Sequence, residues 1–134
     1  MRSVKDPSEP AVGETYSIRT KRAYEPSTPA DGKRILIDRL WPRGVSKRTA
    51  HLDDWRRELA PSEGLRKWFG HDPAKFPRFR ELYRTELLRQ PESLATLILE
   101  AERGRVTLVY AAKDSTHCNA TVLKELVQEI GAEQ

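Results

Sequence analysis

The chain has 134 residues, of which 37% are hydrophobic and 33% are charged, and 24 Lys and Arg against 20 Asp and Glu give a net charge of +4. This length fits one domain with a real core, and the well-mixed charges favour solvated helix faces over the basic stripe of a typical nucleic-acid binder. Cys118 is the only cysteine, which excludes an intrachain disulfide and a cysteine-rich zinc site.

The first 14 residues predict a mobile tail, because they are polar and show no periodicity. They lack the apolar centre of a secretory signal, and no apolar run approaches the length of a membrane span, so we expect a cytoplasmic protein. Residues 15–134 then form a single α/β domain. Within it, the alternating residues 16–24 are typical of an edge strand with one wet face, and residues 25–32 have the composition of a loop.

Residues 34–45 contain a strong buried-strand signal that runs into a polar turn. Ile35, Leu36 and Ile37 are consecutive apolar residues, which predicts a parallel strand covered by helices on both faces. Asp38 and Arg39 follow the strand and point to opposite faces of the sheet. The next four residues, Trp-Pro-Arg-Gly, predict a turn with proline at its second position and glycine at its fourth.

Residues 51–103 have a helical pattern throughout and predict four helices. The first has apolar residues at i, i+3 and i+7 and breaks at Pro61. The second is capped by Ser62 and stops at Gly70. The third begins near Asp72 or Phe76 and the fourth runs from about residue 92 to 103. The inward residues expected for these helices are Leu52, Trp55 and Leu59; Leu65, Trp68 and Phe69; Phe76, Phe79, Tyr83 and Leu87; and Leu94, Leu97, Ile98 and Ala101.

Residues 106–112 are almost entirely apolar and predict a second buried strand, which ends in the charged pair Lys113 and Asp114. A last helix is predicted from about Thr116 to Ile130, with Gly131 as its stop. An all-helical connection between the two buried strands is expected of parallel neighbours. The fold class is therefore α/β, a small, mostly parallel sheet with an edge strand, covered by helices.

Parallel neighbours end at the same edge of a sheet, and ligands of open parallel sheets bind beyond those ends. The expected ligand-binding residues carry cationic or hydrogen-bonding groups, which together with a helix N-terminus beginning at Ser115 or Thr116 favour an anionic small molecule bearing phosphate or carboxylate. These residues are Arg39, Arg43, Lys113, Ser115 and Asn119.

Other interpretations stay open at this edge. Asp38 and Asp114 are candidates for moving a proton, or Asp38 pairs with Lys113 and Arg39 with Asp114 in a structural network. Asn119 falls on the covered side of the last helix, where it either ties the helix to the strand ends or contacts ligand.

Two further chemistries are weaker. A nucleophilic role for Cys118 is disfavoured, because the adjacent His117 diverges from it by about 100° on a helix and lies at an exposed rim. The spacing of the His and Asp residues near 51–54 and 71–72 matches no ligand pattern, so we expect no metal and no cofactor. An alternative function is a nucleic-acid- or protein-binding regulatory module, with a basic stripe at Lys47, Arg48, Arg56 and Arg57.

The chain resembles domain-of-unknown-function family 488, in its YeaO-like branch, from about Ile18 to Leu126. The resemblance rests on motifs in a fixed order, namely Lys21-Arg-Ala-Tyr24, Asp38-Arg-Leu-Trp-Pro-Arg-Gly44, Leu52-Asp-Asp-Trp55, Leu65-Arg-Lys-Trp-Phe-Gly-His71, Phe79 with Tyr83 and Glu86-Leu87, and Tyr110-Ala-Ala-Lys-Asp114 followed by Ala120 and Val122-Leu123. It implies a small α/β domain and supplies no reaction. Asparagine is common in the branch where this chain has Cys118, which disfavours a general thiol role.

Overall fold

A computed structural model describes residue 10 and residues 14–133. Within this part of the chain, four parallel strands form one sheet in the order β1-β4-β2-β3. The two buried strands predicted from the sequence are neighbours, with Ile35 opposite Leu108, and the first strand lies at an edge as expected. The α/β fold class is therefore confirmed. The strands are β1 (Ile18–Arg22), β2 (Lys33–Leu36), β3 (Asp54–Trp55) and β4 (Val106–Tyr110).

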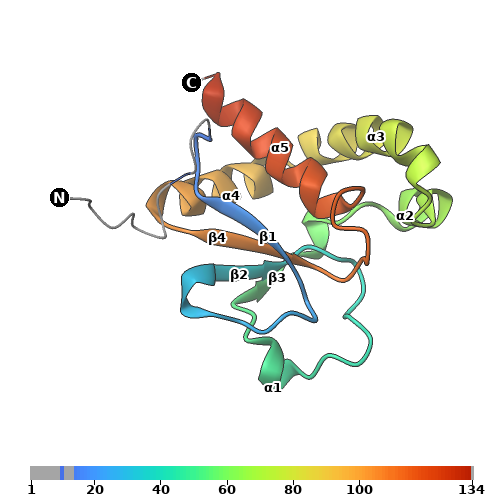
Figure 1. Cartoon of the computed structure of the whole chain (residues 1–134). Coiled ribbons are helices and arrows are strands. Elements are labelled where there is room, and N and C mark those ends of the chain that lie inside the picture. The colour runs from blue at the N-terminus through green and yellow to red at the C-terminus, as the bar shows by residue number, and fades with distance from the viewer. Residues whose placement is uncertain (1–9, 11–13, 134) are drawn as a thin grey trace.

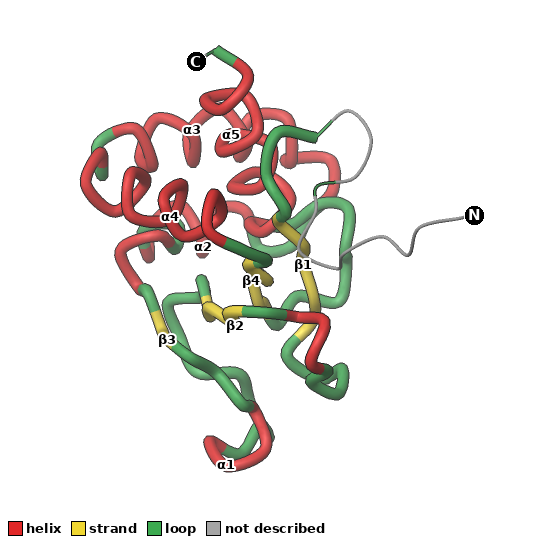
Figure 2. Tube along the Cα trace, turned by 90° about the vertical axis from the view of Figure 1, so that its left-hand side faces the viewer, coloured by secondary structure: helices red, strands yellow, loops and turns green. Residues whose placement is uncertain are grey.

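The longer helices lie together on one side of this sheet. Figures 1 and 2 show α2 to α5 above the strands, whereas α1 and the long loops lie below them. The expectation of helices on both faces is therefore wrong. The helices are α1 (Lys47–Ala50), α2 (Glu63–Phe69), α3 (Phe76–Leu88), α4 (Pro91–Arg103) and α5 (Asn119–Ala132), with short 3₁₀ turns at Pro29–Asp31, Arg57–Leu59 and Pro73–Lys75.

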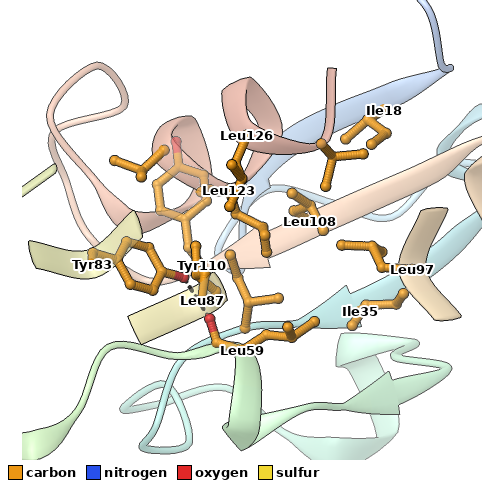
Figure 3. Close-up of a cluster of buried hydrophobic side chains, with 14 of the residues drawn as sticks. Ile18, Ile35, Leu59, Tyr83, Leu87, Leu97, Leu108, Tyr110, Leu123 and Leu126 are labelled. Carbon is orange, nitrogen blue, oxygen red and sulfur yellow. Dashed lines mark hydrogen bonds between the residues drawn. The ribbon is translucent and has the colours of Figure 1, made fainter. Parts of the chain in front are cut away.

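The helix-covered face of the sheet carries the hydrophobic core (Figure 3). Alternate residues of each strand point to this face, so Ile35 and Leu108 pack with apolar residues of α3, α4 and α5. Tyr83 of α3 is fully buried, and its hydroxyl donates to the Leu59 carbonyl at 2.5 Å. Burying this apolar surface supplies the main driving force for folding. The helix stripes expected around Phe79, Tyr83 and Leu87 and around Leu94 and Leu97 are confirmed.

The opposite face combines polar contacts with the buried side chains of Leu36 and Val109. Arg34 of β2 is buried there, where it donates to Asp31 at 2.7 Å and to the Ala50 carbonyl at 3.0 Å. Lys21 of β1 also donates to Asp31, and Thr107 of β4 donates to the Asp31 carbonyl. Burial raises the pKa of the Asp31 carboxyl, but hydrogen bonds from Thr28, Lys21 and Arg34 lower it to about 2. Charged and hydroxyl side chains of the strands thus attach α1 and the 3₁₀ turn Pro29–Asp31 to this face.

The helix predicted from Leu52 to Leu59 is not present. Instead, residues 54–55 form β3, which adds a fourth strand beside β2. The backbone N–H of Asp53 donates to the Arg34 carbonyl, and that of Arg56 to the Leu36 carbonyl. Pairing with β2 satisfies these backbone groups. The helical spacing of the apolar residues is a weaker determinant here than this pairing. The crossover between the two central strands is therefore not all-helical.

An ion-pair cluster anchors this new edge strand to α4. Both Nη atoms of Arg56 donate to Glu100, at 2.5 and 2.7 Å, and Lys33 of β2 also donates to Glu100. Hydrogen bonds from Arg56, followed by those from Lys33, lower the pKa of Glu100 to about 2. We call Glu100, Arg56 and Lys33 the Glu100 network.

The ends of the helices follow the predicted caps in part. Ser62 caps α2 and Gly70 ends it in the left-handed region, as expected, but Trp68 of α2 is 42% exposed instead of buried. The last helix begins at Asn119 and runs past Gly131. At Gly131 an added Cβ would lie 2.3 Å from Cε2 of Tyr16, so the helix uses glycine for close packing and not as a stop.

Nearly all of the predicted mobile tail, residues 1–14, lies outside the described residues. In the part of the chain that is described, no helix is long and apolar enough to cross a membrane.

Candidate functional site at the carboxyl edge of the sheet

The exits of β2 and β4 converge, as their parallel pairing requires. The backbone N–H of Ile37 donates to the Val109 carbonyl at 3.1 Å, which extends the pairing of the strands by one residue. Directly beyond it, Asp38 and Ala111 are joined by a hydrogen bond. The loops after the two strands therefore begin side by side, at the edge where the sequence places its candidate site.

Asp38 binds uncharged donors at this edge. Its Oδ2 accepts from the Ala111 backbone N–H at 2.9 Å and its Oδ1 from the Asn119 amide at 3.0 Å. The same amide donates to the Ile37 carbonyl at 3.1 Å, so Asn119 ties α5 to the end of β2. We call Asp38, Ala111 and Asn119 the Asp38 network.

Burial raises the pKa of Asp38 above its ordinary value. The hydrogen bonds from Asn119 and Ala111, and the charges of His71 and Arg66, oppose this shift. Neither Lys113 nor any other cation is within ion-pairing distance of Asp38 among the described residues, so the pair of Asp38 with Lys113 considered from the sequence is not formed. Each carboxylate oxygen accepts one internal hydrogen bond, so Asp38 fastens the strand ends.

Arg39 and Arg43 lie on the loop that follows β2. Arg39 donates through Nε to the Pro61 carbonyl at 3.1 Å, so it does not pair with Asp114. The turn begins one residue later than expected, with the Val45 N–H donating to the Pro42 carbonyl and Gly44 at φ 79° in the third position. Arg43 is exposed there, and its guanidinium has no partner among the described residues.

Lys113, Asp114 and Ser115 form the turn between β4 and α5. Asp114 accepts from the N–H groups of Thr116 and His117, both at 2.9 Å, and from the His117 ring at 2.8 Å. These bonds, led by the His117 backbone, lower the pKa of Asp114. They form a separate turn, so α5 begins at Asn119 and not at Ser115 or Thr116. Lys113 is exposed and its ammonium has no partner within the described residues.

Cys118 and His117 do not form a catalytic pair. Cys118 is 1% exposed, and its Sγ lies 3.5 Å from the Thr121 hydroxyl and 3.8 Å from the Ser115 carbonyl. His117 contacts Phe76 edge-on at 5.1 Å between ring centres and binds Asp114 through Nδ1. Burial of the thiol and the engagement of the imidazole argue against nucleophilic chemistry at this position.

Arg22 and Tyr24 join the edge as residues that the sequence reasoning missed. Arg22 donates to the carbonyls of Ala112 and Ala111, at 2.9 and 3.3 Å, and its Cζ lies 5.0 Å from the centre of the Tyr24 ring. The Tyr24 hydroxyl donates to the Arg43 carbonyl at 3.0 Å. These contacts link the turn of Arg43 to the exit of β4. The parallel direction of β1, which places its carboxyl end here, is the signal that could have found them.

The basic stripe and the possible metal ligands considered from the sequence do not form sites. The basic stripe considered for nucleic acid is interrupted, because Arg56 is buried in the Glu100 network and Arg57 stacks on Trp55 at 3.7 Å. Asp53 and Asp54 accept hydrogen bonds from Arg34 and Arg56, and no group of three metal-binding side chains occurs among residues 10 and 14–133.

The comparisons with known proteins agree with the family that the motifs indicate. The model of the inactive DUF488-N3 subclade matches residues 17–134. The chain belongs to the DUF488 family. Within the matched range lie Arg22, Asp38, Arg43, Lys113 and Asn119, so the whole carboxyl edge is part of the DUF488 domain.

Two relatives are uncharacterised proteins. The chain is 40% identical over 114 residues to the uncharacterised protein YeaO of Escherichia coli K12, covering 85% of this chain and 99% of that protein. It is 37% identical over 110 residues to the uncharacterised protein Rv3073c of Mycobacterium tuberculosis H37Rv, covering 82% and 92%. No solved structure matches the chain. The comparisons therefore establish the DUF488 family and its YeaO-like character, and they name no substrate.

Proposed function

We propose that this DUF488 protein is a non-catalytic domain that binds a small anion, bearing phosphate or carboxylate, at the carboxyl edge of its sheet. Arg43 and Lys113 are the principal ligands, and Arg39 contributes through the two Nη groups that its bond to Pro61 leaves available. A guanidinium offers paired N–H donors to an oxyanion, and an ammonium adds a mobile positive charge.

The observation that carries this proposal is that the acids at the edge have internal partners whereas two cations do not. Asp38 accepts hydrogen bonds from Ala111 and Asn119, and Asp114 accepts from the residues of its own turn. The exposed cations of the edge, Arg43 and Lys113, have no partner among the described residues. The contacts of Tyr24 with Arg43 and of Arg22 with Ala112 support a fixed spacing of the two loops. The edge thus keeps a positive charge that its own acids do not neutralise.

The absence of catalysis is supported by the same bonds. A carboxylate that acts as a general base must reach the substrate, whereas those of Asp38 and Asp114 accept hydrogen bonds from internal donors. Cys118 is buried, and Asn119 ties α5 to β2. The description of the matching subclade as inactive is in keeping with a binding role.

The test is calorimetric titration of the protein with inorganic phosphate, citrate and ADP at fixed ionic strength. We expect at least one of these anions to bind, and the double variant Arg43→Ala, Lys113→Ala to weaken that binding by about tenfold or more, which is about 1.4 kcal/mol. Arg103→Ala, which removes an exposed cation at the far end of α4, is the matched control and leaves affinity unchanged. Absence of binding, or equal losses in both variants, contradicts the proposal.

A further inference from the structure

A second surface, formed by other residues than the candidate anion site, is hollowed between α2 and α3. The cavity has a volume of about 520 Å³. Leu65 and Trp68 of α2 and Leu82 of α3 form its apolar part. Arg78 and Glu86 of α3 form its polar part, together with Arg89, which follows the last residue of α3. On α3 these residues recur at helical spacing, so the groove runs along the helix. The carboxyl edge uses none of these residues.

Trp68 is the feature of this groove that core packing leaves unexplained. The helical pattern places it with Leu65 and Phe69, which are buried, yet Trp68 is 42% exposed. Lys75 fixes its surroundings by donating to the Trp68 carbonyl at 2.9 Å and by lying 5.3 Å from the centre of the indole ring. The indole N–H has no partner among the described residues. An exposed tryptophan beside a groove is the kind of side chain that dominates binding energy at protein interfaces.

The charges of the groove favour an acidic occupant. Glu86 is the only acid among its lining residues, and both of its oxygens accept from Ser62, at 2.8 and 2.5 Å. Arg89 has no side-chain partner in the described part of the chain, and Arg78 pairs only with Glu81, in a bond exposed on both sides. Exposed pairs of this kind contribute little free energy and exchange readily for a better partner.

The spacing of the cations limits the length of the occupant. Arg78 on α3 and Arg89, which follows the last residue of α3, are eleven positions apart in the chain, or about 16 Å along the helix axis, with Leu82 between them. An extended peptide covers about 16 Å in roughly five residues. We infer that the groove is a docking site for an acidic peptide segment of a partner protein, with a large apolar side chain against Trp68 and Leu82 and carboxylates on both sides that meet Arg78 and Arg89.

The test is selection from a displayed library of random 12-residue peptides on the full chain, followed by titration of the enriched peptides in solution. We expect enriched peptides to carry a Leu, Ile, Phe or Trp flanked by Asp or Glu. Trp68→Ala and Arg89→Glu each weaken their binding by about tenfold or more. Arg103→Glu, the same charge change on α4, leaves it unchanged. Both groove residues are exposed, so circular dichroism of each variant should match that of the native protein.

Several results overturn the inference. Enrichment of basic or uncharged peptides contradicts the acidic partner, and failure to enrich any peptide, or equal binding by Trp68→Ala, contradicts the docking site. Competition by a 12-nucleotide single-stranded DNA would assign the groove to nucleic acid. Sedimentation that shows a dimer which Trp68→Ala dissociates would assign it to a second copy of this chain.

Discussion

Two carboxylates fasten distant segments to the sheet, Asp38 beyond β2 and Glu100 on α4, and their partners differ in charge. Asp38 accepts from a backbone N–H and an amide, whereas Glu100 accepts from Arg56 and Lys33. The pKa of Asp38 is raised because burial outweighs its neutral donors, and that of Glu100 is lowered to about 2 because cations outweigh burial. The two carboxylates have similar structural roles, but their contributions to stability should depend on pH in opposite directions.

The largest expected effect is the loss of the Asp38 network. Asp38→Ala removes the acceptor of the Ala111 N–H and one acceptor of the Asn119 amide in a half-buried place. We expect the free energy of unfolding to fall by about 3 kcal/mol, because unsatisfied donors are costly when water cannot reach them. Urea unfolding followed by circular dichroism measures this. The exposed acid Glu58 is the control, and Glu58→Ala should change stability by less than about 0.5 kcal/mol; equal effects in the two variants would refute the network's importance.

Breaking the Glu100 network ranks second. Glu100→Gln keeps the shape of the side chain but removes the charge that Arg56 and Lys33 share. We expect a loss of about 2 kcal/mol at pH 7, because buried Arg56 is left without its main counter-charge and retains only Asp54. Urea unfolding measures this loss as well. An unchanged unfolding midpoint would show that the attraction within the ion pairs only balances the cost of removing their charges from water.

The sharpest contrast is the direction of the pH dependence. A carboxyl with a raised folded pKa binds its proton more readily in the folded state, so the native protein gains stability over Asp38→Asn as the pH falls through that raised value toward 3.8. For Glu100 the sign is reversed, and the advantage over Glu100→Gln is lost as the pH falls from about 4.5 to about 2. Urea unfolding of the native protein and the two variants at several pH values tests this. If the free energies of unfolding of all three change in parallel with pH, the two carboxylates do not differ in the predicted way.

The smallest effect is expected at Lys33. Its side chain is 43% exposed, whereas that of Arg56 is 10% exposed, and both bind Glu100. Lys33→Met should lower the free energy of unfolding by about 0.5 kcal/mol or less, since exposed ion pairs are weak. Thermal unfolding of Lys33→Met beside Arg56→Met compares the two cations. If Lys33→Met costs as much as Arg56→Met, the Glu100 network does not depend mainly on its buried arginine.

Much of the fold could be predicted from the sequence, because its strongest signals are local. The apolar run at 35–37 and the almost entirely apolar residues 106–112 mark neighbouring parallel strands, and Ser62 and Gly70 bound α2 as their chemistry requires. β3 could not be predicted in this way. Its pairing depends on backbone groups of Arg34 and Leu36, about twenty residues away, and no periodicity within residues 52–59 encodes them.

The sequence predicted which residues meet at the carboxyl edge better than it predicted their hydrogen bonds. The helical wheel placed Asn119 on the covered side of α5, and it contacts Asp38 and the end of β2. The predicted pair of Asp38 with Lys113 is not formed, because backbone donors compete with side chains at the end of a strand. The Ala111 N–H, which continues the pairing of β2 with β4, donates to Asp38 instead. The types of side chain in a sequence do not show which backbone N–H groups will act as donors. Anion binding itself stays a prediction.

The strand order has a consequence for how the protein is made. β4 lies between β1 and β2, so the chain's first two strands pair with a strand that is synthesised last, as the contact of Ser17 with Arg105 across 88 residues illustrates. Until the ribosome has released β4, both early strands expose unpaired backbone edges. The four-stranded sheet therefore forms only after β4 has been made, and premature termination before residue 106 leaves β1 without its partner strand and β2 with β3 alone.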